Sequence, residues 1–435
     1  MVSRRPPAGE RFGATRPVRI ASGPVPSSVL TPPVRSATLP RVLAGLLVLA
    51  SIGTAVVLDI RHPDVLLRLI PSTDMRELHV DFDTFWRSAV AMVNGTDIYD
   101  TPAKLRNLNP PLMTVLLGPF APLDEVTAYR IWVVLTTLMV AGSVLAVARE
   151  LRLRAMYTVP ALLAVLASSP LHGTLVLGQI YPVLLVGLVA GWIAERRGHP
   201  VLAAVLFGIT VALKPSLAPV LLLPAVQRRW APFRAGILSA AVASLVGVLV
   251  AGPSSGIGWL RIAFTEPVPD TLDNASLPGL AVRFGLPPAA GLAVGLVVLV
   301  GTLAWCGRHR DRIGVGGDAT GTAVWAVVAA GLLFSPIAWH NYLMLLFPGA
   351  LILITLGRGA ATAAMLAVAV IPVSWNDDWP ADGVGQAVGR SLYFLILLGY
   401  WVLLLRSAPS AGPSPSPAGR SPATRSAAGR FADVA

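Results

Sequence analysis

The sequence is short of charged residues, and it is almost free of cysteine and lysine. Only 13% of its 435 residues are charged and 54% are hydrophobic, whereas ordinary soluble domains carry about 25% charged residues. The single cysteine, Cys306, excludes a disulfide framework and a cysteine metal cluster. Membrane barrels need strands with alternating polarity, and that pattern is absent. With a mean hydropathy of +0.69, the chain is predicted to be an all-α, polytopic membrane protein.

Several common catalytic motifs are also missing. No HExxH, CxxC, P-loop or GxSxG motif occurs, so zinc hydrolysis, ATP hydrolysis and Ser-triad chemistry have no support. The net charge of +12 would suit nucleic acid, but the arginines form short clusters beside apolar segments and in both tails. Such placement is typical of membrane topology, in which cytoplasmic loops are basic. We therefore predict no nucleic-acid partner, no metal and no cofactor.

The hydrophobic segments divide the chain into three parts. Residues 1–40 are rich in Pro, Ser and Arg and are predicted to be a disordered cytoplasmic tail, as are residues 407–435. Residues 41–406 are predicted to form one transmembrane domain of about 12 helices, with an uncertainty of roughly two because several segments are too short for a full crossing. The basic clusters fall at alternate ends of these segments. Both termini are therefore expected in the cytoplasm, and residues 61–109 outside.

One polar stretch follows the first apolar segment. Asp81 and Asp83 lie two residues apart. The apolar residues that follow at helical spacing are Phe82, Phe85, Trp86, Ala89, Val90 and Val93. This pattern predicts a short amphipathic helix on the bilayer surface with both carboxylates at its start. The helix dipole would keep the carboxylates ionised and able to accept protons; alternatively, either aspartate only caps the helix.

The predicted topology places further polar residues on the same extracytoplasmic side. They are His172, Gln179, Lys214, Asn274, Arg283, His340 and Asn341. A hairpin is expected over residues 157–194, with 172–179 as its outer turn. Short proline-containing helices flank several of these residues, and broken helices are tolerated at membrane depth where they line a protein-enclosed cavity.

Lys214 is the most informative of these residues, because Lys104 is the only other lysine. It stands between two apolar segments, where a cation costs roughly 2.5–3.5 kcal/mol to insert. Such a residue usually pairs with an anion or lines a pathway, and a lysine suits a phosphate as a point charge. The alternative is that Lys214 extends to the outer headgroups.

The remaining candidates also have two interpretations. His340 follows Trp339 and could hydrogen-bond a phosphate or a sugar hydroxyl, or it could belong to an interfacial aromatic belt. Asn274 and Arg283 could contact a polar ligand, although loop capping explains Asn274 nearly as well.

Three motifs near the first carboxylate resemble the first outer loop of glycosyltransferase family 87. They are Asp81-Phe-Asp-Thr-Phe-Trp86, Gly95-Thr-Asp-Ile-Tyr99 and Asn109-Pro-Pro-Leu112. The resemblance continues at Gly178-Gln179, Lys214-Pro215, Asn274-Ala-Ser-Leu277 with Arg283, and Ser335-Pro-Ile-Ala-Trp339, and so covers most of residues 42–405. The chain departs from the family at two positions. Asn109 stands where an aromatic residue is common, and His340 directly follows Trp339 instead of lying a couple of places further on.

The resemblance implies a GT-C fold and a hexosyltransferase. Mannose would pass from polyprenyl-phosphate mannose to a lipid-linked mannoside of the phosphatidylinositol type, with inversion to an α-linkage, on the extracytoplasmic face. Asp81, at the head of its motif, would be the general base, with Asp83 as the alternative. Lys214, His340 and Arg283 would stabilise the leaving phosphate. Gln179, Asp83, Asn274 and Trp339 would complete the substrate site. The implied partners are the lipid-linked donor, the lipid-linked glycan acceptor and membrane lipids.

Other functions stay open on sequence alone. A lipid or sugar transporter predicts intramembrane charges in several spans and symmetry between halves, and neither is evident. A scaffold without activity is a second alternative. A third is a GT-C enzyme that uses another lipid-linked sugar, such as arabinose.

Overall fold

The computed structural model describes residues 38–63, 75–265, 273–309, 321–379 and 383–407. Within these ranges all regular secondary structure is helical, which confirms the predicted all-α class. The two predicted tails, 1–40 and 407–435, lie almost wholly outside the described residues.

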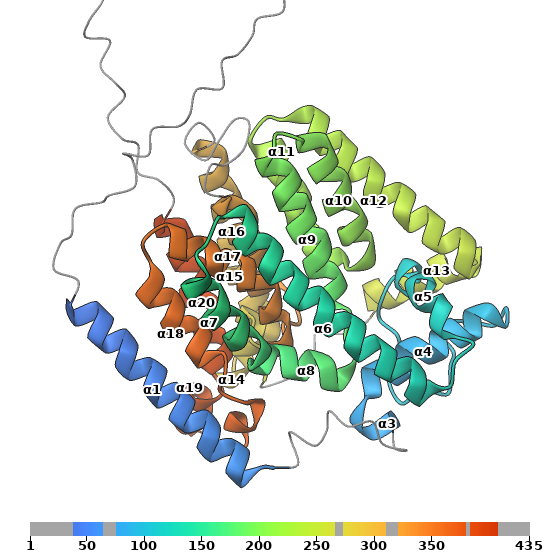
Figure 1. Ribbon diagram of the computed structural model, residues 1–435. Coiled ribbons are helices and arrows are strands. Elements are labelled where there is room, and N and C mark those ends of the chain that lie inside the picture. The colour runs from blue at the N-terminus through green and yellow to red at the C-terminus, as the bar shows by residue number, and fades with distance from the viewer. Residues whose placement is uncertain (1–37, 64–74, 266–272, 310–320, 380–382, 408–435) are drawn as a thin grey trace, which may run out of the picture.

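The chain forms a bundle of helices of very different lengths (Figure 1). Its first half contains α1 (Thr38–Arg61), α3 (Met75–Leu78), α4 (Val80–Val93), α5 (Pro111–Leu117), η2 (Gly118–Phe120), α6 (Glu125–Glu150), α7 (Ala155–Leu166), α8 (Ser169–Leu177), α9 (Tyr181–Arg196) and α10 (Pro200–Leu213). Its second half contains η3 (Pro215–Leu217), α11 (Pro219–Val226), α12 (Trp230–Ala251), α13 (Pro253–Thr265), α14 (Leu277–Arg283), α15 (Pro288–Arg308), α16 (Thr322–Phe334), η4 (His340–Leu346), α17 (Phe347–Thr355), α18 (Gly359–Val368), η5 (Val373–Asn376), α19 (Gly383–Gly389) and α20 (Leu392–Ser407).

Only some of these helices are long enough to cross a membrane. In the described part of the chain, α1, α6, α12 and α15 meet the requirement, and the bent pairs α7–α8 and α19–α20 raise the number to six if each pair is one span. Six shorter apolar segments accompany them. The predicted total of about 12 is therefore not confirmed, because it is reached only if every shorter segment also crosses. Prolines at Pro111, Pro200 and Pro215 begin three of the short segments, since proline fits the first turn of a helix and not its interior.

The predicted outer turn at residues 172–179 is wrong, because most of this stretch is helix α8. The Ser168 hydroxyl accepts a hydrogen bond from the Leu171 amide at 3.4 Å, and Pro170 lies in the first turn. A serine cap followed by proline starts a new helix, at 45° to α7. The alternation of apolar segments and basic clusters also predicts a second outer loop over residues 252 to about 286, and this stretch likewise contains two helices, α13 and α14.

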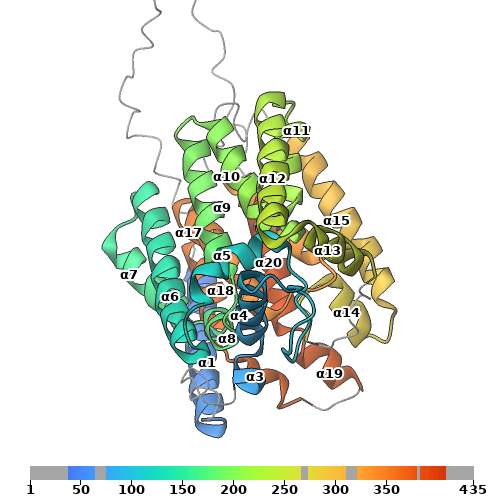
Figure 2. The ribbon, with the colours of Figure 1, turned by 90° about the vertical axis from the view of Figure 1, so that its right-hand side faces the viewer.

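Each of three ion pairs joins two residues that are predicted to lie on the same side of the membrane. Arg61 lies 3.4 Å from Asp378, and Arg390 lies 3.5 Å from Asp273; the alternation of apolar segments and basic clusters places all four residues outside. Arg197 lies 2.9 Å from Glu150, and the same alternation places both residues in basic flanks inside. The pairing agrees with the predicted topology, while the side of the membrane that each end faces stays a prediction. Helices α4, α5 and α13 lie together at one side of the bundle (Figures 1 and 2).

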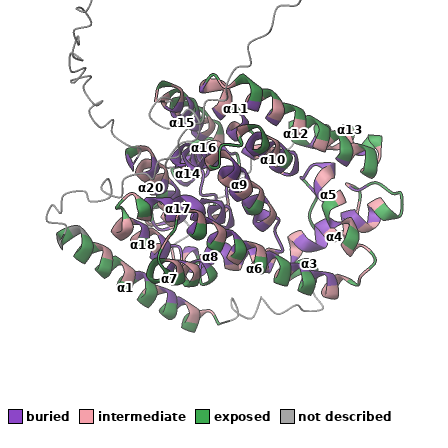
Figure 3. Ribbon diagram, turned by 45° about the horizontal axis from the view of Figure 1, so that its top comes forward, coloured by how far each residue is buried: buried purple, intermediate pink, exposed green. Residues whose placement is uncertain are grey.

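Burial separates the centre of the bundle from its perimeter (Figure 3). Every residue of α16 from Thr322 to Leu333 is buried, as expected for a helix that is apolar on all sides and surrounded by protein. By contrast, α1 and α12 expose large apolar side chains, among them Leu46 at 58% and Leu238 at 64%. Such apolar surfaces on helices of spanning length suit contact with lipid.

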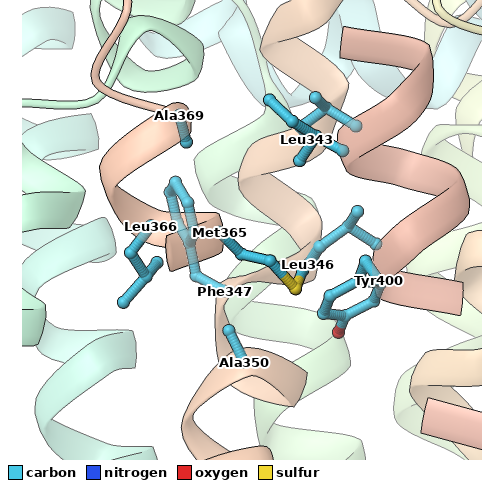
Figure 4. Close-up of a pocket in the computed structure, with 9 residues that line it drawn as sticks. Leu343, Leu346, Phe347, Ala350, Met365, Leu366, Ala369 and Tyr400 are labelled. Carbon is cyan, nitrogen blue, oxygen red and sulfur yellow. The ribbon is translucent and has the colours of Figure 1, made fainter. Parts of the chain in front are cut away.

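Two apolar cavities of very different volume lie between the helices. A space of about 20 Å³, enough for about one water, remains where Leu343, Phe347 and Met365 close around it beside Tyr400 (Figure 4). A cavity of about 680 Å³ lies between α1, α7 and α18, and its lining is almost entirely apolar.

Candidate active site

The first turn of α4 carries the two carboxylates, as predicted, and neither of them caps the helix. Asp81 and Asp83 lie in the first turn, and His79 occupies the N-cap position. The His79 ring is held by its Nδ1, which lies 2.7 Å from the Val176 carbonyl oxygen of α8. The aspartate side chains are consequently available for contacts with other helices.

The apolar side of α4 faces the protein and not the bilayer surface that the sequence suggested. Phe82 is fully buried, and its ring centroid lies 5.4 Å from that of Tyr129 and 6.5 Å from that of Trp132, both on α6. The Trp86 indole donates to the Phe120 carbonyl at 3.2 Å. Burial of these aromatic rings against α6 and η2 stabilises the docked position of α4. Packing therefore fixes the direction in which each carboxylate points.

The Asp83 side chain is enclosed by protein and paired with an arginine. Its side chain is fully buried and forms an ion pair with Arg87 one turn further along α4. Arg87 also lies 3.4 Å from Glu125, at the start of α6. An acid in such a cluster links two helices and has little freedom to accept a proton from a substrate.

Asp81 has different surroundings. It is half-buried, and its Oδ2 accepts a hydrogen bond from Gln179 Nε2 at 2.6 Å. Burial raises the pKa of Asp81 to about 6, while the Gln179 hydrogen bond and the attraction of Lys214 act in the opposite direction. Near neutral pH this carboxylate is mostly ionised yet basic enough to accept a proton, which is the balance a general base needs.

The close approach of α8 to α4 depends on Gly178. This residue ends α8 in the left-handed region with φ of 71°, a conformation that favours glycine. A Cβ at this position would lie 2.5 Å from Phe82 Cβ. The absence of a side chain therefore lets the next residue, Gln179, reach Asp81.

Lys214 stands at the break between α10 and η3. Its backbone is extended, with φ of −145° and ψ of 92°, because a following proline disfavours the helical conformation. The Lys214 ammonium donates to Asn109 Oδ1 at 3.1 Å and lies 5.8 Å from the centroid of the Tyr342 ring. The structure thus brings Asp81, Gln179 and Lys214 together, from three distant parts of the chain.

Sequence reasoning missed Asn109 and two tyrosines as members of this group. Asn109 was noted only as a departure from the family pattern, yet its amide oxygen is a partner of Lys214. The Tyr342 ring lies 4.4 Å, between ring centroids, from the ring of Tyr181, which follows Gln179 closely in sequence; the two rings are inclined at 46°. The position of Asn109 directly before a Pro-Pro pair was the available signal for the first. The tyrosines carried no comparable signal, because aromatic residues are common in apolar helices.

His340 and Trp339 lie at the start of η4, two or three residues before Tyr342. The His340 ring packs over Gly173 of α8, where a Cβ would come within 2.4 Å of Nε2. The centroid of the His340 ring lies 5.3 Å from the centroid of the Tyr393 ring. Trp339 is partly buried against the apolar core. His340 is therefore next to α8, and Tyr342 connects this segment to Lys214.

Asn274 and Arg283 form a second polar cluster with backbone partners. The Asn274 amide donates to the Pro336 carbonyl at 2.6 Å, and its oxygen accepts from the Ala338 amide at 2.9 Å. Arg283 is 5% exposed and donates to Asn274 O at 2.9 Å and to Ser391 Oγ at 3.0 Å. These bonds join the segment before α14 to the segments before η4 and α20. Their predicted contact with substrate stays a prediction.

Comparisons with known proteins agree with the resemblance noted in the sequence. The model of Glycosyltransferase family 87 matches residues 107–336, a segment that contains Asn109, Gln179 and Lys214. An alpha-(1->3)-arabinofuranosyltransferase of Mycolicibacterium smegmatis is 29% identical over 326 residues, which are 69% of this chain and 68% of that protein. A polyprenol-phosphate-mannose-dependent alpha-(1-2)-phosphatidylinositol mannoside mannosyltransferase of Mycobacterium tuberculosis is 27% identical over 68% of this chain and 76% of its own length.

One solved structure is also similar. The crystal structure of ArnT from Cupriavidus metallidurans bound to undecaprenyl phosphate matches with a TM-score of 0.40 and 16% identity, over 80% of this chain and 76% of that chain. The family model matches more than half of the chain, and the helices are those of a multi-pass membrane protein. This protein belongs to glycosyltransferase family 87.

Proposed function

We propose that the protein transfers mannose from a polyprenyl phosphate to a hydroxyl group of a lipid-linked mannoside, with inversion at the anomeric carbon. The observation that carries the proposal is the half-buried Asp81 carboxylate, held by Gln179 and attracted by the Lys214 ammonium. An inverting displacement requires a base for the acceptor hydroxyl and a group that stabilises the charge of the leaving phosphate. On the predicted topology, the site faces the extracytoplasmic side and both termini are cytoplasmic.

The proposed reaction is a single displacement. The acceptor hydroxyl oxygen forms a bond to the anomeric carbon, and its proton passes to Asp81. The bond between the anomeric carbon and the phosphate oxygen breaks, and the electron pair leaves with the polyprenyl phosphate. A positioned base contributes about 10²- to 10⁴-fold to such a step.

Lys214 is proposed to receive the leaving phosphate. Negative charge develops on the phosphate oxygens as the bond breaks, and a fixed cation stabilises that charge best where water is scarce. The hydrogen bond from Lys214 to Asn109 holds the ammonium in place without neutralising it, because an amide oxygen carries no net charge. His340 is proposed to assist from the start of η4, and Arg283 and Asn274 to hold the loops that frame the site.

A lipid donor also needs space for its chain. The apolar cavity of about 680 Å³ between α1, α7 and α18 supports binding of a hydrocarbon chain, since each buried CH₂ group contributes about 0.8 kcal/mol. The names of two relatives support a lipid-linked sugar as donor.

Arabinofuranose is a second candidate for the transferred sugar. Relatives named as alpha-(1->3)-arabinofuranosyltransferases match about the same share of this chain as the mannosyltransferases do. The contacts of Asp81 and Lys214 fit either donor, because they concern the acceptor proton and the phosphate and not the sugar ring.

The test is a transfer assay in vesicles that contain the purified protein and a mixture of lipid-linked glycan acceptors. Radiolabelled polyprenyl-phosphate mannose and polyprenyl-phosphate arabinofuranose are supplied in separate reactions, to the wild type, to Asp81→Asn and to Asp100→Asn. Asp100 is an exposed aspartate of the same predicted outer loop and serves as the matched control. Label should move from the mannose donor in the wild type and Asp100→Asn only, and an α-specific mannosidase should release it. Transfer from the arabinose donor alone would establish the second candidate, and transfer from neither donor would refute both.

A further inference from the structure

A polar cavity lies at the end of α4 opposite to Asp81. Its volume is about 260 Å³. Met92 and residues 95–98 line one wall, and residues 250–252 with Ser254 and Ser255 line the other. The first wall belongs to the predicted outer loop 61–109, and the second is the junction of α12 and α13. Figure 2 views this side of the molecule.

The lining offers hydrogen-bonding groups and one negative charge. Asp97 is exposed, and its Oδ1 accepts from the Tyr99 amide at 2.9 Å. Asp97 Oδ2 has no hydrogen-bond partner among the described residues. The Ser254 hydroxyl is exposed on the other wall, while Thr96 and Ser255 donate to backbone carbonyls and keep lone pairs to accept further bonds.

This set of groups favours an uncharged ligand with many hydroxyls. Sugar hydroxyls donate charge-assisted hydrogen bonds to a carboxylate and accept bonds from serine and threonine. No lysine or arginine lines the cavity, so a phosphate would face Asp97 without a compensating cation. The described residues also contain no group of three His, Cys, Asp or Glu side chains that could hold a metal ion.

The size of the cavity fits one sugar unit. Pockets for drug-sized ligands measure about 300–1,000 Å³, and this cavity is slightly smaller. Met92, Ile98 and Val250 add apolar surface, against which the C–H face of a sugar ring can pack.

The cavity is too far from Asp81 to hold the reacting sugar. Met92 and Asp81 are on the same helix, about 16 Å apart along its axis at 1.5 Å per residue. The two places are nevertheless connected. The Tyr99 hydroxyl, next to the cavity, donates to the Asn109 carbonyl at 3.0 Å, and the Asn109 side chain binds Lys214. Two hydrogen bonds, from Tyr99 to Asn109 and from Lys214 to Asn109, therefore connect the edge of this cavity with Lys214 of the proposed catalytic group.

We propose that the cavity binds a sugar unit of the acceptor that lies several units away from the hydroxyl being glycosylated. The acceptor is then a lipid that already carries an oligosaccharide, and not a lipid with a single sugar. This inference rests on the proposed function, because it assigns part of the acceptor to the cavity.

The experiment compares acceptors that carry one sugar with acceptors that carry four or more. Asp97→Asn removes the negative charge and retains an oxygen for the Tyr99 amide, Ser254→Trp fills the cavity, and Asp100→Asn is the control. Loss of a hydrogen bond to a charged group should raise KM for the long acceptor about tenfold or more in the first two variants. Their kcat values and their KM values for the one-sugar acceptor should stay at the wild-type level. Unchanged KM for the long acceptor in both variants, or equal increases for both acceptors, would overturn the proposal.

A binding measurement separates this inference from the proposed function. Saturation-transfer NMR with a free oligosaccharide of the acceptor sugar should give a signal with the wild type and with Asp81→Asn, and a much weaker signal with Asp97→Asn and Ser254→Trp. Binding with this pattern but without sugar transfer would support the cavity and refute the proposed reaction. If the wild type transfers sugar but neither Asp97→Asn nor Ser254→Trp weakens oligosaccharide binding, the proposed reaction is supported and the proposed role of the cavity is refuted.

Discussion

Asp81 and Asp83 belong to one turn of α4, but the protein surrounds them in opposite ways. Two residues along a helix rotate the side chain by about 200°, so the two carboxylates point to different neighbours. The fully buried Asp83 meets Arg87 and Glu125 of α6, which are both partly buried. Asp81 meets Gln179 and is attracted by Lys214, and it is only partly buried.

The difference teaches how one short motif can supply both structure and chemistry. A buried carboxylate with a guanidinium partner on its own helix forms a charge-assisted hydrogen bond that helps to hold the helix in place. A carboxylate that is partly desolvated, and held mainly by a neutral amide, keeps a raised pKa and can take up a proton. The same residue type therefore anchors α4 at one position and is proposed to react at the other.

The largest effect is expected from Asp81→Asn. The asparagine keeps the size of the side chain but cannot accept the acceptor proton, so transfer should fall by about 10²- to 10⁴-fold. Initial rates at saturating donor and acceptor, normalised to the amount of folded protein, measure this loss. A residual rate above about a tenth of the wild-type rate would exclude Asp81 as the base and shift the role to Asp83.

Lys214→Ala should have the next largest effect. Removing one group that stabilises developing charge lowers kcat by about 10²- to 10³-fold, and loss of the contact with the donor phosphate should also raise KM for the donor while KM for the acceptor stays near the wild-type value. Lys104→Ala is the matched control, because the only other lysine is half-exposed and pairs with Glu77. Equal increases in KM for the donor and for the acceptor would argue against a phosphate partner for Lys214.

Asp83→Asn should alter stability more than chemistry. It leaves the partly buried Arg87 without its nearest carboxylate, and losing a hydrogen bond to a charged group costs about 1.5–3 kcal/mol. Thermal unfolding in detergent should therefore move to lower temperature, while the folded fraction keeps transfer within a few-fold of the wild type. A variant that is as stable as the wild type but inactive would reverse the roles assigned to the two aspartates.

Some parts of the site, among them α4 and Lys214, could be predicted from the sequence alone. The helical spacing of Phe82 and Phe85 and the position of the acids correctly predicted the helix and its first turn. The isolated lysine likewise marked Lys214, because a cation between apolar segments is costly. Both signals are local and need no knowledge of the fold.

The partners of these residues could not be predicted in the same way. Gln179 reaches Asp81 across 98 positions and Asn109 reaches Lys214 across 105, and no local pattern encodes such pairings. The wrong prediction of a turn at residues 172–179, most of which belong to α8, had a local cause. Ser168 and Pro170 start a helix where polar residues had suggested a loop, so His172 and Gly173 are in a helix and support His340 from one side.

The central claim, that ionised Asp81 accepts the proton of the acceptor, is tested most directly by the pH dependence of kcat/KM in the wild type and in Gln179→Leu. The pKa of Asp81 is about 6, and a base works only when it is deprotonated, so the wild-type value should fall as the pH drops below about 6. The Gln179 hydrogen bond lowers this pKa, so its removal should move the fall to higher pH. The same acid limb in both proteins, or no limb at all, would contradict the claim.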